Sequence, residues 1–269
     1  MEKHFQKALI YIMILSSAFS RLNAQNSNDT VTVQEPVQDS VTMAGIQKNK
    51  LNYKRLIVPA ALIGYGVAGL AMDNLKQLNN STRTEINEHQ PARMNLDNYT
   101  QYAPAAMVYG FNTIGIKGKH NLRDRTIIYA SSQLIVAAFT MPLKYLVKEE
   151  RPDGSNTLSF PSGHSATAFS SAQFMFREYK DTNFWLSLSG YPLAIFTGVY
   201  RMLNDKHWLG DVIAGAGFGI LSTELAYWLF PKVDLLLRGK NKTKNVLSST
   251  MVMPFYQNKA VGIGLVKTF

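Results

Sequence analysis

The sequence of 269 residues contains no cysteine. Disulfide bonds, zinc sites built from thiolates and cysteine nucleophiles are therefore excluded. It also lacks a basic run interleaved with aromatic residues, the pattern typical of nucleic-acid-binding modules, so we expect no nucleic-acid partner.

Positive charge, by contrast, is in excess. The net charge is +10 and the isoelectric point is near 9.6. Such an excess favours an anionic partner, either a phospholipid surface or a phosphorylated substrate. The lysines gather in short connectors and in the tail RGKNKTK (238–244), where solvated or membrane-flanking positions are the better interpretation.

The first 24 residues resemble a secretory signal peptide, with Lys3 and Lys7 ahead of an apolar stretch. An uncleaved first membrane helix is the alternative. Residues 25–50 are polar and lack helical periodicity, which predicts a flexible linker. We expect the folded body to occupy residues 51–245.

Apolar segments of helical length follow, and they predict an all-α bundle of about six helices. These segments are 56–72, 102–116, 126–147, 166–176, 184–200 and 209–230. The third is long enough to cross a bilayer. Small residues in GYGVAG (64–69) and AGAGFG (214–219) predict close helix contacts. Residues 73–98 read as a polar connector.

The tail 246–269 has no helical signature. VMPFY and AVGIGLV, separated by a short QNK-containing turn, predict two strands of a small C-terminal β-hairpin. We expect this hairpin to pack on the helical body.

The stretch SFPSGHSATA (159–168) combines turn residues with a helix start. Pro161 and Gly163 favour a turn, Ser162 is an acceptable N-cap, and a helix can begin near His164. Such a helix start directs backbone N–H groups, a hydroxyl and an imidazole at one point, which suits a phosphate. The alternative is an ordinary helix cap beside a chance histidine.

Two further groups of residues have fixed spacings. Lys144 is followed after six residues by Arg151, and Arg201 is followed after five residues by His207, with Asp211 four positions further. Because neighbouring helices are antiparallel, the connectors that carry these residues emerge at the same end of the bundle. The lysine and the two arginines supply cationic donors that match phosphate oxygens.

The histidines complete a reaction scheme. Asp211 can hold one ring nitrogen of His207 as N–H, which leaves the other nitrogen as a nucleophile. His164 is then available to protonate the departing oxygen. Such a site needs no metal and no cofactor, since fixed cations neutralise the transferring group.

These motifs resemble the signature of the type 2 phosphatidic acid phosphatase (PAP2) superfamily. That superfamily includes lipid phosphatases, bacterial class A acid phosphatases and vanadium haloperoxidases. The resemblance covers about residues 51–231, and Tyr200 departs from it where the signature has serine. The matching residues are Lys144, Arg151, Pro152, Pro161, Ser162, Gly163, His164, Arg201, His207 and Asp211.

The resemblance implies both a fold and residue roles. The fold would be the helical bundle shared by these phosphatases and the vanadium haloperoxidases. His207 would form a phosphohistidine intermediate, Asp211 would orient it, and His164 would be the general acid. The phosphate would be held by Lys144, Arg151, Ser162, Gly163 and Arg201.

We therefore expect a phosphoric monoester hydrolase that acts on phosphate monoesters or pyrophosphates, and on lipids in particular. The family suggests phosphatidic acid, phosphatidylglycerol phosphate, polyprenyl pyrophosphate or lipid A, and the sequence does not choose among them. A secreted soluble class A-type acid phosphatase is the main alternative, because the mean hydropathy is only −0.08. A non-enzymatic membrane scaffold and a haloperoxidase are the others. The oligomeric state is left open.

The sidedness of the site raises a conflict. Lysine and arginine are denser in the connectors away from the site, which predicts a site facing the periplasm of a bacterial envelope. A cleaved signal followed by three spans would instead return the site to the cytoplasm. We expect the short segment 102–116 not to cross, which removes the conflict; a soluble periplasmic body would remove it too.

A few other polar residues are expected to have ordinary roles. His89 and His120 lie in polar connectors and should be solvated, and Glu149 should belong to a solvated face. Glu224 lies within the last apolar helix, where a packed polar contact is expected rather than a second catalytic acid.

Overall fold

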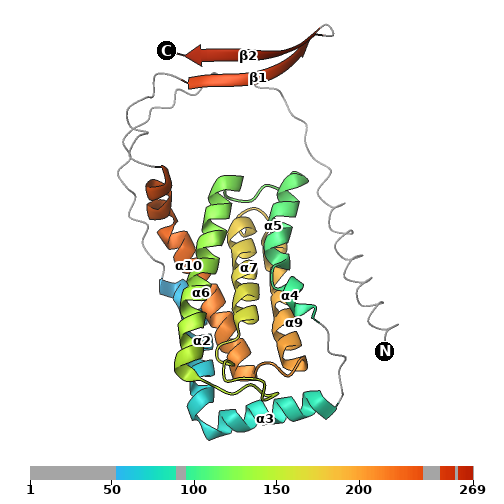
Figure 1. Cartoon of the computed structure of the whole chain (residues 1–269), viewed down its shortest axis with the longest axis vertical. Coiled ribbons are helices and arrows are strands. Elements are labelled where there is room, and N and C mark those ends of the chain that lie inside the picture. Colours follow the sequence, from blue (N-terminus) through green and yellow to red (C-terminus); the bar gives the residue numbers. More distant parts are fainter. Residues whose placement is uncertain (1–52, 89–94, 239–248, 258–259, 269) are drawn as a thin grey trace, which may run out of the picture. The chain divides into compact units, whose positions relative to one another are not determined.

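A computed structural model of the chain describes residues 53–88, 95–238, 249–257 and 260–268 (Figure 1). The predicted signal peptide (1–24) and linker (25–50) lie outside these residues. The body is helical, which confirms the predicted all-α bundle for this part of the chain. Its helices are η1 (Tyr53–Leu56), α2 (Ile57–Ala71), α3 (Asp73–Glu88), α4 (Asp97–Thr100), α5 (Ala103–Thr113), α6 (Leu122–Val147), α7 (Gly163–Tyr179), α8 (Phe184–Leu188), α9 (Gly190–Leu203) and α10 (Leu209–Arg238).

Helix α7 lies in the middle of the bundle and packs against α10, α9, α5, α6 and α8 (Figure 1). Small residues allow the close approach of α10: a Cβ added to Gly219 would overlap the carbonyl oxygen of Ala166. Hydroxyls join α7 to α10 and to α6, since Ser170 Oγ lies 2.9 Å from Thr223 Oγ1 of α10 and donates to Ser132 Oγ of α6 at 3.3 Å. Interfaces of this kind, with small residues and hydroxyl pairs, are typical of helices that pack in membranes.

Three described helices are long and apolar enough to cross a membrane, judged by length and composition. They are Tyr53–Ala71, Leu122–Val147 and Leu209–Leu237. The predicted segment 184–200 is not one continuous helix, because α8 ends at Leu188 and α9 begins at Gly190. Pro192 has no N–H with which to continue the hydrogen-bond ladder of α8, so the chain starts a new helix there.

One predicted connector is partly helical. Residues 73–88 are not an irregular connector but the helix α3, in which Asn79 Oδ1 accepts the backbone N–H of Gly210 at 3.1 Å. This contact ties α3 to the first turn of α10. Only Leu75, Leu78 and Ile86 of its 16 residues are apolar, which is too few for the sequence to predict a helix there.

Helix α5 carries the chain from one end of the bundle to the other. Asn98, before α5, lies 2.8 Å from His164 at the start of α7. Lys119, after α5, donates its backbone N–H at 3.0 Å to Glu178 near the end of α7. The two flanks of segment 102–116 therefore contact opposite ends of α7, because the connector 114–121 adds to the length of the short helix; that the segment does not cross a membrane stays a prediction.

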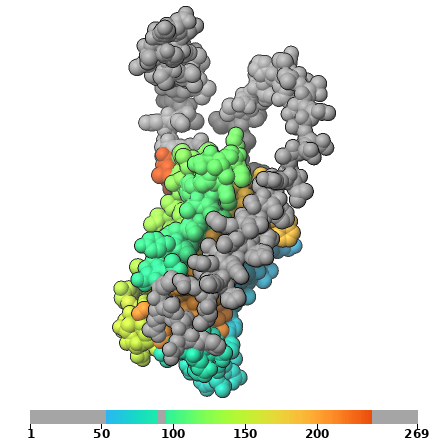
Figure 2. Space-filling view, turned by 90° about the vertical axis from the view of Figure 1, so that its right-hand side faces the viewer, coloured from blue at the N-terminus to red at the C-terminus, as the bar shows by residue number. Residues whose placement is uncertain are grey.

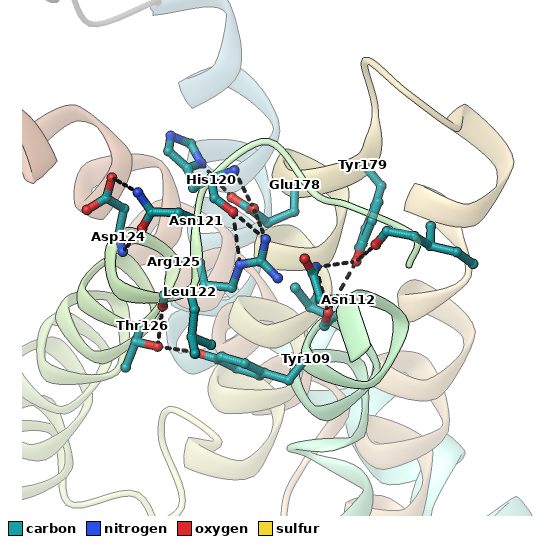
Figure 3. A network of polar contacts seen from close by, with 12 residues as sticks. Tyr109, Asn112, His120, Asn121, Leu122, Asp124, Arg125, Thr126, Glu178 and Tyr179 are labelled. Atoms are coloured by element: carbon teal, nitrogen blue, oxygen red, sulfur yellow. Dashed lines mark hydrogen bonds and ion pairs between the residues drawn. The ribbon is translucent and has the colours of Figure 1, made fainter. Parts of the chain in front are cut away.

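The end of the bundle distant from α3 is fixed by a buried carboxylate (Figure 3). Glu178 accepts hydrogen bonds from the backbone N–H of His120 at 3.1 Å and from Tyr227 Oη at 2.7 Å, and its Oε1 lies 2.7 Å from His120 Nδ1. Arg125, also buried, lies 3.9 Å from the same carboxylate. His120 is thus a packed residue and not a solvated one; His89 lies outside the described residues.

Strands β1 (Ser249–Gln257) and β2 (Ala260–Thr268) pair antiparallel, with Ser249 opposite Thr268 and Gln257 opposite Ala260. The two-residue connection between them lies outside the described residues. That these strands pack on the helical body stays a prediction, and the fold class rests on the helices alone.

Candidate active site

The predicted site residues gather where two connectors meet, at the α3 end of the bundle. Figure 2 shows α3 in teal at the bottom, beside the segment near residue 150 in yellow-green. Connector 148–162 follows α6 and connector 204–208 follows α9. Asp153 joins them, because its backbone N–H donates to Asp205 O at 3.2 Å and its carboxylate accepts from Lys206 Nζ at 2.5 Å. This bonding fixes the two connectors against each other.

The core beneath connector 148–162 positions it from below. Phe160 is buried and packs with Ala214 and Phe218 of α10. Lys144, in the last turn of α6, donates from Nζ to the carbonyl oxygens of Leu158, Ser159 and Pro161 at 2.8, 3.3 and 2.8 Å. The ammonium of Lys144 therefore holds the connector that precedes α7, and its contact with phosphate stays a prediction.

His207 and Asp211 form a buried pair at the start of α10. His207 Nδ1 lies 3.5 Å from Asp211 Oδ2. The same carboxylate accepts from Ser159 Oγ at 2.5 Å and from the backbone N–H of Trp208 at 3.0 Å. With its Nδ1 side turned to the carboxylate, His207 keeps Nε2 for another partner. The separation is longer than a good hydrogen bond, as is common in a substrate-free site.

Burial keeps the His207 imidazole neutral. It lowers the pKa of His207 to about 4; Asp211 opposes this shift, while Arg201 and Lys144 reinforce it. A neutral imidazole has a free lone pair, so this side chain is a ready nucleophile near pH 7.

His164 lies one residue inside α7, and its Nε2 is 2.8 Å from Asn98 Oδ1 of α4. Burial lowers its pKa to about 4, and the positive charges of Arg201, Arg151 and Lys144 act in the same direction. Asp97, which precedes Asn98, pairs with Arg201, and the backbone N–H of Ser162 at the start of α7 donates to Asp211 O at 3.1 Å. These contacts bring the start of α7, Arg201 and the His207–Asp211 pair together.

Two guanidinium groups bring unused donors to this place. Arg201 of α9 is buried and donates from Nη1 to Asp97 Oδ2 at 2.5 Å, yet its Nε has no partner. The Nε of Arg151 is likewise buried without a partner. Burial and the charge of Arg201 lower the pKa of Arg151. An unpaired buried donor costs free energy, so these two positions are suited to an anion that would pair with them.

The start of α7 supplies the remaining part of the cradle. Ser162 caps the helix and is buried; its Oγ accepts from Ser165 Oγ at 2.9 Å. A Cβ added to Gly163 would meet nothing within 4 Å. The side-chain position of Gly163 is therefore open, in the first turn of α7, where the helix dipole attracts negative charge.

The structure also adds polar residues that sequence reasoning did not assign to the site. Asp97 and Asn98 orient Arg201 and His164, and Ser159 holds Asp211. Glu149, expected on a solvated face, is half-buried; its Oε2 has no partner. Its pKa is raised to about 9 by burial and by hydrogen bonding to Asp211. Of these residues, only Ser159 could have been assigned to the site from the sequence, because it lies two positions before Pro161 of the Pro-Ser-Gly-His motif.

Comparison with known proteins gives relatives of two kinds. A lipid A 1-phosphatase of Porphyromonas gingivalis is 31% identical over 223 residues, which are 79% of this chain and 46% of that protein. The bacitracin transport permease protein BcrC of Bacillus licheniformis is 37% identical over 78 residues, 29% of this chain and 36% of that protein. The chain thus matches less than half the length of these relatives.

Among solved structures, LpxE of Aquifex aeolicus matches with a TM-score of 0.42 and 20% identity, over 56% of this chain and 94% of that one. The family model described as the PAP2 superfamily matches residues 125–234. This range contains every predicted site residue from Lys144 to Asp211. Through residues 125–234, the chain belongs to the PAP2 superfamily.

Proposed function

We propose that the chain is a metal-independent phosphatase that transfers the phosphoryl group of a lipid phosphate to His207 and then to water. The observation that carries this proposal is the pair of buried, unpartnered guanidinium Nε atoms of Arg151 and Arg201 beside the open start of α7. Two kinds of donor, guanidinium groups and helix N–H groups, would bind the phosphate. Their geometry suits a tetrahedral oxyanion.

The proposed reaction has two steps. His207 Nε2 attacks phosphorus, a P–N bond forms and the P–O bond to the substrate breaks, while His164 gives a proton to the leaving oxygen. In the second step His164 takes a proton from water, whose oxygen attacks phosphorus and breaks the P–N bond. Asp211 stabilises the positive charge on His207 during the first step, and the two arginines stabilise the equatorial oxygens throughout.

His164 must carry a proton at the start of this reaction, yet burial and nearby cations lower its pKa to about 4. A phosphate with two negative charges placed between Arg151 and Arg201 opposes the field of those cations. The pKa of His164 then rises on binding, because a nearby negative charge favours the imidazolium. The substrate thus brings about the protonation that its own cleavage needs.

A lipid is the substrate class that we propose. Three helices are candidate membrane spans, and two described relatives act at membranes by their names: a lipid A 1-phosphatase and a transport permease. We propose the 1-phosphate of lipid A as the first substrate to test, ahead of phosphatidic acid, phosphatidylglycerol phosphate and polyprenyl pyrophosphate. The soluble acid phosphatase fits these spans less well.

The test is release of phosphate from this panel and from soluble esters, with a chelator present throughout. We expect turnover of at least one lipid, and we expect His207→Ala to abolish it. In rapid-quench experiments, labelled phosphate should be trapped on the wild-type chain and on His164→Ala, but not on His207→Ala. Label on the His207→Ala variant, or activity only with soluble esters, would contradict the proposal.

We propose further that the site faces the periplasm. The support is charge: a set of basic residues lies at the end of the bundle distant from the site, and positive residues favour the cytoplasmic side. That set is Lys117, Lys119, Arg123, Arg125, Arg177 and Lys180. Because α5 runs from one end of the bundle to the other, counting membrane crossings from a cleaved signal peptide does not support this orientation. The charge pattern is its sole support.

A further inference from the structure

A second pocket lies far from the catalytic residues, near the other end of α7. Its volume is about 450 Å³. Arg177, one of its residues, is 14 positions after Gly163, which places it about 21 Å along the helix at 1.5 Å per residue. The pocket is lined by Arg55, Val58, Pro59, Gln173, Phe176, Arg177, Lys180, Tyr191, Ile220 and Glu224.

The charges of this pocket do not balance. Three cations, Arg55, Arg177 and Lys180, share it with a single carboxylate, that of Glu224. Arg177 Nη1 already pairs with Glu224 at 2.5 Å, and Gln173 donates to the same carboxylate at 2.6 Å. Arg55 lies farther away, at 3.7 Å, and its side chain is 40% exposed.

Lys180 is held at the rim of the pocket. Its Nζ lies 3.2 Å from Asp181, a residue outside the pocket, and its side chain is 23% exposed. Glu224 pairs with Arg177 and Arg55, and Asp181 pairs with Lys180, so three cations face two carboxylates and one positive charge is in excess. The pocket therefore has the electrostatic character of an anion site.

Apolar walls distinguish this pocket from a site for a free inorganic anion. Val58 and Pro59 belong to α2, Ile220 belongs to α10, and Phe176 precedes Arg177 on α7. Both α2 and α10 are candidate membrane spans. Val58 is 60% exposed, so apolar surface continues outward from the pocket along a face that a bilayer would cover. A ligand that fits both parts has an anionic group joined to a hydrocarbon chain.

We propose that this pocket binds an anionic phospholipid, with its phosphate between Arg55 and Lys180 and an acyl chain against Val58 and Ile220. The buried floor is pre-ordered for such binding, because Tyr191 Oη donates to Gln173, which in turn donates to Glu224. The site is independent of the proposed hydrolysis: a phosphodiester such as phosphatidylglycerol occupies it without being a monoester substrate.

The chain offers a matched control for this proposal. Lys119 and Lys180 both form ion pairs with Asp181, at 3.7 and 3.2 Å, but Lys180 lines the pocket and Lys119 does not. Lys180→Gln and Lys119→Gln therefore make the same charge change at the same end of the bundle. Arg55→Gln is a second variant within the pocket, at an exposed position where folding is little affected.

The experiment measures lipid binding by the purified full chain in detergent, with orthovanadate present to fill the catalytic site. We expect phosphatidylglycerol to bind more tightly than phosphatidylcholine. Lys180→Gln and Arg55→Gln should each weaken phosphatidylglycerol binding about tenfold, the effect of losing one charged hydrogen bond. Lys119→Gln should leave binding within about twofold, as exposed ion pairs contribute little.

Three outcomes would overturn the proposal. Equal affinity for the two lipids would show that charge does not select the ligand. An equal loss in the Lys119→Gln and Lys180→Gln variants would assign the effect to general surface charge. If millimolar inorganic phosphate displaced bound phosphatidylglycerol as well as unlabelled phosphatidylglycerol does, the apolar walls would not contribute to binding. Thermal unfolding without lipid checks that each variant is folded.

Discussion

At the scale of single residues, the site combines groups whose charges are set by burial. His207 is neutral beside a carboxylate, and Glu149 is a carboxyl that burial and Asp211 keep protonated up to a pKa of about 9. The proton on Glu149 lets two neighbouring carboxyls share one hydrogen bond instead of repelling each other. This arrangement links the stability of the fold to pH.

The pH dependence that follows has a definite sign. The unfolded chain releases the Glu149 proton at its ordinary pKa of 4.5, whereas the folded chain holds it up to about 9. The contribution of Glu149 to stability is therefore complete below pH 4.5 and is lost as the pH rises towards 9. Glu149→Gln keeps a donor for Asp211 without a proton to lose.

We expect Glu149→Gln to raise the unfolding temperature at pH 8.5 relative to the wild type, on the scale of about 2–4 °C per kcal/mol, and to change it little at pH 5. Thermal unfolding in detergent at several pH values measures this difference. Parallel curves for the two proteins across that range would contradict the assignment of a protonated Glu149.

The sequence predicted some site residues and not others for a physical reason. Phosphoryl transfer fixes residue types at fixed spacings within one segment, so His164, His207 and Asp211 could be identified from the chain. Asp97 and Asn98 act across more than 60 residues, on Arg201 and His164, and only the packing of α4 against α9 and α7 brings them there. No local pattern encodes such a contact.

At the scale of helices, the small residues of the two glycine-rich stretches have unequal roles. A Cβ on Gly219 of α10 would overlap backbone atoms of α7, whereas a Cβ on Gly64 of α2 would meet nothing within 4 Å. Gly66, two residues later, does pack closely, since its Cβ would lie 2.5 Å from that of Ala214. Composition predicted tight helix contacts in both stretches, but the face that each glycine presents depends on the helix rotation, which composition does not specify.

This difference gives a matched pair of substitutions. We expect Gly219→Ala to lower the free energy of unfolding by about 1–3 kcal/mol, because α7 and α10 must move apart. Gly64→Ala should raise it by about 0.4–1 kcal/mol, because alanine restricts the unfolded chain without a clash. Denaturant unfolding of both variants measures these values, and similar effects at both positions would show that the α7–α10 contact is not tight.

At the scale of the whole molecule, the natural lack of cysteine provides a background for testing orientation. Ser155 lies exposed in the connector at the site, and Thr182 lies exposed after α7, at the opposite end of the bundle. In intact cells, a membrane-impermeant maleimide should label Ser155→Cys and not Thr182→Cys until the membrane is permeabilised. The reverse pattern would place the proposed site in the cytoplasm.

The sequence predicted the helices that are apolar and continuous, but it did not predict the polar helix α3 or the interruption between α8 and α9. The apolar lengths predicted the bundle, but α3 has few apolar residues, and α8 and α9 are separated at Ser189, just before Pro192 in the first turn of α9. The length of α5 did not indicate that its flanks lie at opposite ends of the bundle, because the connector 114–121 supplies the rest of that distance. The order of the helices and the common end of the two site connectors followed from antiparallel neighbours alone.

Asp211 makes contacts to two parts of the proposed site, one through its side chain and one through its backbone. Its carboxylate faces His207, while its backbone oxygen accepts the N–H of Ser162 at 3.1 Å. Asp211 thereby connects one turn of α10 both to His207, the proposed nucleophile, and to the start of α7, where the phosphate would bind. If helices separate to admit a lipid, His207 and the start of α7 should therefore move together. The entrance can then widen while the distance between the nucleophile and the bound phosphate stays the same.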